Sequence, residues 1–171
     1  MGTRDFGEEK RYVLGHLEQK TVGLTLRLNW SITPDLSIQY YGQPFISAGK
    51  YRAFKRITEA RAQRLEGRYS LYGESELFFD ASANAYAVDE NGDGAADYGF
   101  SNPNFNFRQF RSNLVIRWEY RPGSALYLVW SQGRTGFGSG GDFMLREDFR
   151  SLFDVHPRNV FLIKFSYCFQ L

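Results

Sequence analysis

The residues best suited to chemistry form a run of oxygen-bearing side chains in the middle of the sequence. Four of them stand at alternating or nearby positions around a glycine: Asp89, Asn91, Asp93 and Asp97. Ca²⁺ takes hard oxygen ligands at such positions, and the glycine allows the sharp bend between them. The spacing therefore predicts a calcium loop. Its twelfth position is Phe100 instead of the usual glutamate, so a solvated, turn-rich loop stays open as the alternative.

A second group of candidates consists of charged residues at the polar positions of alternating segments. They are Arg27, Arg111, Arg117, Glu119, Arg121 and Lys164. If these segments are strands of a membrane barrel, the six side chains face its lumen and favour anionic or sugar solutes. The alternative is an interior ion-pair network that only solvates the lumen. Two of the six, Arg117 and Glu119, lie on one face and can share such a network.

Other kinds of chemistry find little support in the sequence. His16 and His156 have no third ligand at metal spacing, and the single cysteine, Cys168, excludes an internal disulfide. The nucleophile elbow, the phosphate loop and the zinc-protease helix motif are absent. The acidic residues are scattered, so they do not define a paired-carboxylate site for glycoside hydrolysis. No catalytic residue and no organic cofactor is predicted.

The composition favours strands as the elements that position these side chains. Aromatic residues make up 18% of the 171 residues, and there are 17 glycines. Aromatic side chains suit a pleated surface, and glycines suit the turns between strands. The net charge of +2 is too small to suggest a nucleic-acid partner. No apolar run approaches the length of a membrane-spanning helix.

Hydrophobic alternation predicts five long strands, at residues 17–32, 36–48, 107–121, 125–133 and 159–171. In the first of them the even positions from Val22 to Ile32 are all apolar. The side chains expected on the apolar faces or at their aromatic ends are Leu26, Leu28, Trp30, Tyr40, Ile116, Trp118, Tyr120, Phe161, Ile163, Phe165, Tyr167 and Phe169.

The connections between these strands alternate in length. Those at Pro34 and at Pro122-Gly123 are tight turns, whereas residues 49–106 and 134–158 are predicted to be long loops. Within the loops, residues 51–67 and 143–153 could each form a helix. Short turns on one side and long loops on the other are typical of outer-membrane barrels.

Strand length favours a membrane barrel over a soluble sandwich, which also alternates. Strands of about nine to eleven residues cross a bilayer at a tilt, and soluble strands are shorter on average. With tight turns in the periplasm, the last strand ends there on an aromatic alternation that the barrel-insertion machinery would recognise. Bacterial barrels have an even number of strands, from eight upward, so we expect an incomplete barrel whose upstream strands are missing.

Residues 105–134 resemble a known family. The string Arg-Trp-Glu-Tyr-Arg-Pro-Gly-Ser, at 117–124, is the most specific part, and residues 19–29, 43–49 and 159–167 fit as well. The resemblance is to the C-terminal barrel of outer-membrane proteins of uncharacterised function that carry a family-nine-like carbohydrate-binding module ahead of the barrel. It implies a location and an architecture, and it implies no reaction, because that module is not in this chain.

The sequence as a whole thus predicts an all-β fold, an antiparallel transmembrane β-barrel segment in the outer membrane of a Gram-negative bacterium. Its expected role is non-catalytic, in the binding or passage of glycans or other solutes. Its expected partners are outer-membrane lipid, the insertion machinery and the missing strands. A soluble β-sheet carbohydrate-binding module is the first alternative, and part of a membrane-associated hydrolase is the second.

Overall fold

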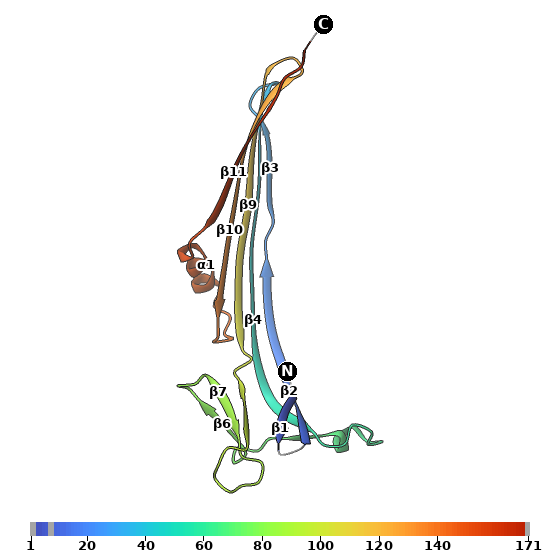
Figure 1. The fold of residues 1–171 in the computed structure, drawn as a ribbon. Coiled ribbons are helices and arrows are strands. Elements are labelled where there is room, and N and C mark those ends of the chain that lie inside the picture. Colours follow the sequence, from blue (N-terminus) through green and yellow to red (C-terminus); the bar gives the residue numbers. More distant parts are fainter. Residues whose placement is uncertain (1–2, 7–8, 170–171) are drawn as a thin grey trace. The chain divides into compact units, whose positions relative to one another are not determined.

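The computed structural model describes residues 3–6 and 9–169, and these residues form an all-β structure with one α-helix (Figure 1). The described strands are β1 (Thr3–Phe6), β2 (Glu9–Gly23), β3 (Leu26–Ser31), β4 (Leu36–Ile57), β5 (Tyr69–Leu71), β6 (Leu77–Asp80), β7 (Ala85–Val88), β8 (Tyr98–Ser101), β9 (Phe105–Arg121), β10 (Ser124–Gly138) and β11 (Arg158–Ser166). The helices are a 3-10 turn, η1 (Leu65–Arg68), and α1 (Leu145–Asp154). Neither of these helices has the length and apolar character needed to span a bilayer.

The strands form two sheets, and every pairing whose register is described is antiparallel. In the larger sheet the neighbours follow the order β1-β2-β4-β9-β10-β11, and β3 and β5 also pair with β4. The smaller sheet has the order β6-β7-β8. The predicted all-β antiparallel fold is therefore confirmed. The described strands form an open sheet and do not close into a barrel, since β11 is paired only with β10.

The chain divides into two compact units, each treated separately below. The first, called the loop unit, comprises Met1–Gln19, Gly49–Phe105 and Ser139–Asp142. The second, called the strand unit, comprises Lys20–Ala48, Asn106–Gly138 and Phe143–Leu171.

In the strand unit, the first predicted strand is interrupted. Residues 17–32 were expected to be one strand, but β2 ends at Gly23 and β3 begins at Leu26. The β3–β4 register places Pro44 opposite Leu24, whose N–H donates to the Pro44 carbonyl at 3.1 Å. Because proline has no N–H, it cannot return the second bond, and the ladder breaks at this point.

The β9–β10 hairpin closes as the sequence predicts. Pro122 and Gly123 form the turn, and Gly123 has a φ of 76°, which a type II turn requires at this position.

The final strand is shorter than expected, because β11 ends at Ser166. Tyr167 to Phe169 lie beyond it, and residues 170–171 of the predicted strand lie outside the described residues.

The loop unit corrects the prediction of a long loop at 49–106, because several strands lie in this range. β4 continues to Ile57 in place of the helix expected at 51–67, and β5 to β8 follow. Phe54 on this extension packs against Tyr86 and Phe100, with ring centroids 4.7 and 5.2 Å away. These partners are some thirty to fifty residues distant in sequence, so local propensity could not reveal them. The core of the unit is completed by Val13, Val88 and Tyr98.

The other predicted loop, 134–158, is also more ordered than expected. β10 continues to Gly138, and the helix predicted at 143–153 is confirmed as α1. α1 buries Leu152 and Asp148. Asp148 accepts a hydrogen bond from the Asn106 side chain at 2.7 Å, and the Phe110 and Phe153 rings are 5.3 Å apart. These contacts hold α1 over the face of the sheet that carries the even-numbered residues of β9.

Candidate functional site

The two faces of the strand unit differ in chemistry, although both carry the apolar side chains of some rows, such as Val115, Val129 and Leu162 on the more polar face. In the described register, Ile116 of β9 lies opposite Leu128 of β10, which lies opposite Ile163 of β11. The neighbouring rows on this face contain Trp118, Leu126 and Phe165 on one side, and Leu114, Trp130 and Phe161 on the other. On β3 and β4 the rows pair Leu28 with Tyr40 and Trp30 with Ile38. We call this surface the apolar face.

Many large side chains of the apolar face are exposed, whereas Leu114, Ile116 and Leu126 are half-buried. Ile163 and Phe161 are each 73% accessible, and Trp118 is 50% accessible. All three tryptophans of the sequence lie on this face. Stacked rings strengthen it, with the Trp130 and Phe161 centroids 5.9 Å apart. The predicted alternation therefore places the apolar residues of several strands side by side on one surface of the sheet.

The opposite surface, called the polar face, brings together several of the predicted lumen residues. Arg117, Tyr127 and Lys164 form one cross-strand row. The Arg117 Nε donates to the Tyr127 hydroxyl at 3.4 Å, and the Lys164 ammonium lies 5.6 Å from the centre of the Tyr127 ring. Arg117 also forms an ion pair with Glu119. The network expected for these two residues is thus present.

The other predicted lumen residues are more dispersed. Arg27 lies over the Tyr41 ring, 5.6 Å from its centre. Arg121 is at the turn end of β9 and donates to the Tyr167 hydroxyl at 2.8 Å. Arg111 pairs across strands with Gly133, where the neighbouring strand presents no side chain. The six charged residues therefore lie along the sheet without converging on one point.

A polar groove lies on the strand unit beside Arg27. It has a volume of about 260 Å³ and is lined by Arg27, Asn29, Gln39, Tyr40, Tyr41, Asn113 and Val115. Its amides offer both donors and acceptors, and its tyrosines offer ring surfaces. Tyr40, which was predicted at the aromatic end of the apolar face, also lines this groove. Its ring lies over Gly42, where an added Cβ would be 3.0 Å from it.

The loop unit contains a charged network that the sequence did not reveal. Glu90 lies 3.2 Å from the Arg11 guanidinium and 3.6 Å from that of Arg56, and it accepts a hydrogen bond from the Tyr98 hydroxyl at 2.8 Å. Arg56 also pairs with Glu76 at 3.0 Å. Positions so far apart in sequence carry no local signal of this proximity, although Glu90 adjoins the predicted calcium run.

Burial and hydrogen bonding fix the protonation states in this network. Burial raises the pKa of the Tyr98 phenol far above its ordinary value, and its hydrogen bonds to Tyr72 and Glu90 raise it further. Tyr98 therefore remains a proton donor to Glu90. A hydrogen bond from the Gly73 backbone lowers the pKa of Glu76, and the bond from Arg56 lowers it further. The network joins β4, β8 and the acidic loop.

The predicted calcium loop is closed by its own hydrogen bonds. The Asp97 carboxylate accepts bonds from the backbone N–H groups of Glu90 at 2.6 Å and Asn91 at 3.2 Å. Asp89 accepts bonds from two glycine N–H groups, those of Gly92 and Gly94. Across residues 3–6 and 9–169, no group of three or more His, Cys, Asp or Glu side chains is placed to hold a metal. Such a loop could also use amide and backbone oxygens, so calcium binding stays a prediction.

Comparison with known proteins places the sequence in a family. Residues 2–170 match the family described as a domain of unknown function, DUF5916. The chain belongs to this family, since the match covers almost its whole length. No curated protein and no solved structure matches the chain.

Proposed function

We propose that this member of the DUF5916 family is a segment of an outer-membrane β-barrel in a Gram-negative bacterium. In this proposal the apolar face contacts lipid and the polar face lines a lumen through which glycans or other solutes bind or pass. The segment has no catalytic role. Its insertion would proceed through the barrel-insertion machinery, which would engage the C-terminal strand.

The exposed apolar face is the observation that carries the proposal. It joins side chains from β3, β4, β9, β10 and β11, and the central row of Ile116, Leu128 and Ile163 contains no charged group. Soluble monomers rarely expose contiguous apolar patches larger than a few hundred Å². Lipid contact removes the cost of hydrating such a surface.

The height of the apolar face also supports a bilayer. On β9 it extends from Phe110 to Tyr120, about ten residue steps of roughly 3.3 Å each. Tilted by about 40°, that length gives a band roughly 25 Å tall, the height typical of outer-membrane barrels. Aromatic side chains stand at both ends of this stretch, with Tyr120 at the turn end, as in the girdles of such barrels, and Phe110 at the end where α1 packs against the sheet.

The open edges of the sheet favour completion by further strands. Among the described strands β11 pairs only with β10, so its outer edge presents backbone N–H and C=O groups that no described strand pairs with. Within hydrocarbon such groups must be satisfied by hydrogen bonding, which a closed barrel achieves. The proposal therefore requires partner strands from the same protein or from another copy of it.

The polar face supports the solute role. The groove beside Arg27 combines amide groups with the Tyr41 ring, a mixture that can bind the hydroxyls and the ring faces of a sugar. The row of Arg117 and Lys164 adds positive charge on the same face. A lumen of this kind would favour neutral glycans and anionic solutes over cations.

The decisive experiment compares two adjacent positions on opposite faces. Nitroxide labels are placed on Ile163→Cys or Lys164→Cys in the full-length protein, with Cys168→Ser and no other cysteine, and the protein is reconstituted into liposomes. Relaxation by oxygen reports contact with hydrocarbon, and relaxation by a water-soluble nickel chelate reports contact with water. We expect the label at 163 to respond mainly to oxygen and the label at 164 mainly to nickel.

The soluble alternative gives a different result. A carbohydrate-binding module outside the membrane would leave both labels accessible to the nickel chelate, since both side chains are exposed. Equal nickel accessibility at the two positions, with the protein recovered in the soluble fraction, would overturn the proposal.

A further inference from the structure

The strand unit contains an apolar cavity between α1 and the sheet. It has a volume of about 590 Å³, within the range of about 300–1,000 Å³ typical of sites for small ligands. The wall from the strands consists of Val22, Gly23, Leu24, Pro44 and Ile46, and the wall from the helix consists of Leu145, Arg146 and Phe149. None of these residues belongs to the groove or to the charged network described above.

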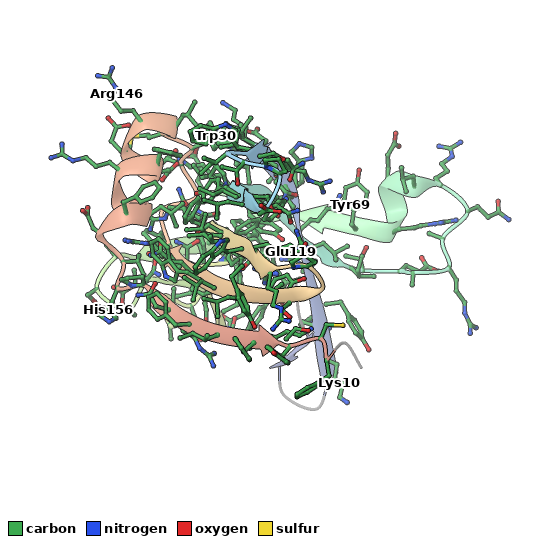
Figure 2. All side chains as sticks on the ribbon, turned by 90° about the horizontal axis from the view of Figure 1, so that it is seen from above. Lys10, Trp30, Tyr69, Glu119, Arg146 and His156 are labelled. Carbon is green, nitrogen blue, oxygen red and sulfur yellow. The ribbon has the colours of Figure 1, made fainter. Side chains whose placement is uncertain are left out.

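The cavity wall is apolar except at one point. Arg146 is the only charged residue among those that line it. Figure 2 shows its side chain extending outward from α1, and the residue is exposed, so its charge is open to solvent at the edge of the cavity that it helps to line. Arg146 has no hydrogen-bond or ion-pair partner within the described part of the chain. Arg150, one helical turn further on, adds positive charge along the same side of α1.

The helix that forms one wall is firmly attached to the sheet. Arg108 donates to the Ser151 hydroxyl and lies 4.0 Å from the Asp148 carboxylate. Arg134 donates to the backbone carbonyls of Phe153 and Val155. These bonds hold the C-terminal half of α1 and the residue after it against the sheet, next to the cavity.

We propose that this cavity binds an acyl chain of an anionic membrane phospholipid, with Arg146 pairing with the phosphate headgroup. The proposal rests on the proposed function, because lipid reaches the cavity from the apolar face. Val22 and Leu24 of the cavity wall lead along the chain into Leu26 and Leu28 of that face. The apolar wall of the cavity is therefore continuous along the chain with the apolar face.

The chemistry of the lining distinguishes this occupant from others. A polypeptide segment would bring backbone N–H and C=O groups that the lining cannot satisfy. An uncharged hydrocarbon would fill the cavity but make no use of the positive charge of Arg146. An amphiphile with one apolar tail and a negative headgroup matches both the wall and the mouth.

The test is native mass spectrometry of the full-length protein released from detergent after incubation with phosphatidylglycerol, or with phosphatidylcholine carrying the same chains. We expect Val22→Trp, which fills the cavity, to weaken retention of both lipids about tenfold or more. Arg146→Gln should weaken phosphatidylglycerol retention by up to roughly fivefold, as for a solvent-exposed ion pair, and leave phosphatidylcholine unchanged. The matched controls are Arg158→Gln and Val160→Trp, at exposed positions of the same unit outside the cavity.

Membrane fractionation of the same variants separates the two proposals. The cavity assignment alone would be overturned if the protein inserts into membranes but wild type, Val22→Trp and Arg146→Gln retain the lipids equally. Soluble protein that retains phosphatidylglycerol in an Arg146-dependent way would support the cavity and overturn the barrel. Binding of a free fatty acid without phosphatidylglycerol would overturn the assignment of a phospholipid.

Discussion

Ile163 is the position where a single charge tests the membrane face most directly. It lies in the central row of the apolar face, opposite Leu128, which in turn lies opposite Ile116. Its neighbour Leu162 is on the other face of β11, opposite Val129. Both side chains are exposed, at 73% and 52%, so their replacement by arginine removes little packing within the chain. The pair Ile163→Arg and Leu162→Arg therefore differs mainly in the surroundings of the new charge.

The expected magnitude follows from these surroundings. An arginine on the lipid face near the bilayer midplane costs about 2–4 kcal/mol in a transmembrane barrel. The unfolding equilibrium constant of Ile163→Arg should then rise about 30-fold to about 900-fold. Leu162→Arg faces water in the lumen and should shift the free energy of unfolding by about 0.5 kcal/mol or less, as is usual at a solvated surface.

The assay is guanidinium unfolding of the full-length protein refolded into liposomes, followed by tryptophan fluorescence. Trp118 and Trp130 flank the central row and report on its environment. Equal midpoints for the two variants, both close to wild type, would refute the lipid-facing assignment. A larger loss for Leu162→Arg would instead mean that the faces are reversed.

Three further predictions concern the loop unit and the hairpin. Glu90→Gln removes the carboxylate that Arg11 and Arg56 share, so limited proteolysis of residues 77–101 should become about tenfold faster. The control Glu59→Gln, at an exposed position, should leave the rate of proteolysis unchanged. Because the pKa of Glu76 is lowered in the folded state, its stabilisation is present above the unfolded value of about 4.3 and is lost as the pH falls through the lower folded value. Protease protection should fall over the same pH range, and Glu76→Gln should reduce that pH dependence. Gly123→Ala should destabilise the hairpin by about 1–2 kcal/mol, measured by thermal unfolding, because its φ is positive and the new Cβ would meet Cys168 at 3.0 Å.

The calcium prediction can be tested separately on the acidic loop. If Ca²⁺ binds there, cleavage within residues 89–97 should slow with added Ca²⁺ relative to chelator, and Asp93→Asn should reduce the difference. Equal cleavage rates would contradict calcium binding and would mean that the hydrogen bonds to Asp89 and Asp97 order the loop by themselves.

The long strands could be predicted because alternation is a local property of sequence. A period of two places side chains on opposite faces whatever the strand pairs with, so the apolar faces that carry Ile116 and Ile163 were predictable for each strand separately. The tight turn at Pro122-Gly123 was predictable for a similar reason, since proline fixes one φ and glycine permits the positive one. The short helix α1 was also predicted from its own segment.

Contacts between distant residues were decided only by the tertiary structure. The extension of β4 to Ile57 depends on Phe54 packing against Phe100, and the network at Glu90 depends on Arg11 lying beside it. The break after Gly23 depends on Pro44 standing opposite Leu24, which becomes known only with the register. The apolar cavity likewise requires α1 to pack over a sheet whose strands come from separate parts of the chain. A sequence pattern determines which way a side chain points along its own strand, whereas cross-strand register and long-range packing determine what it meets there.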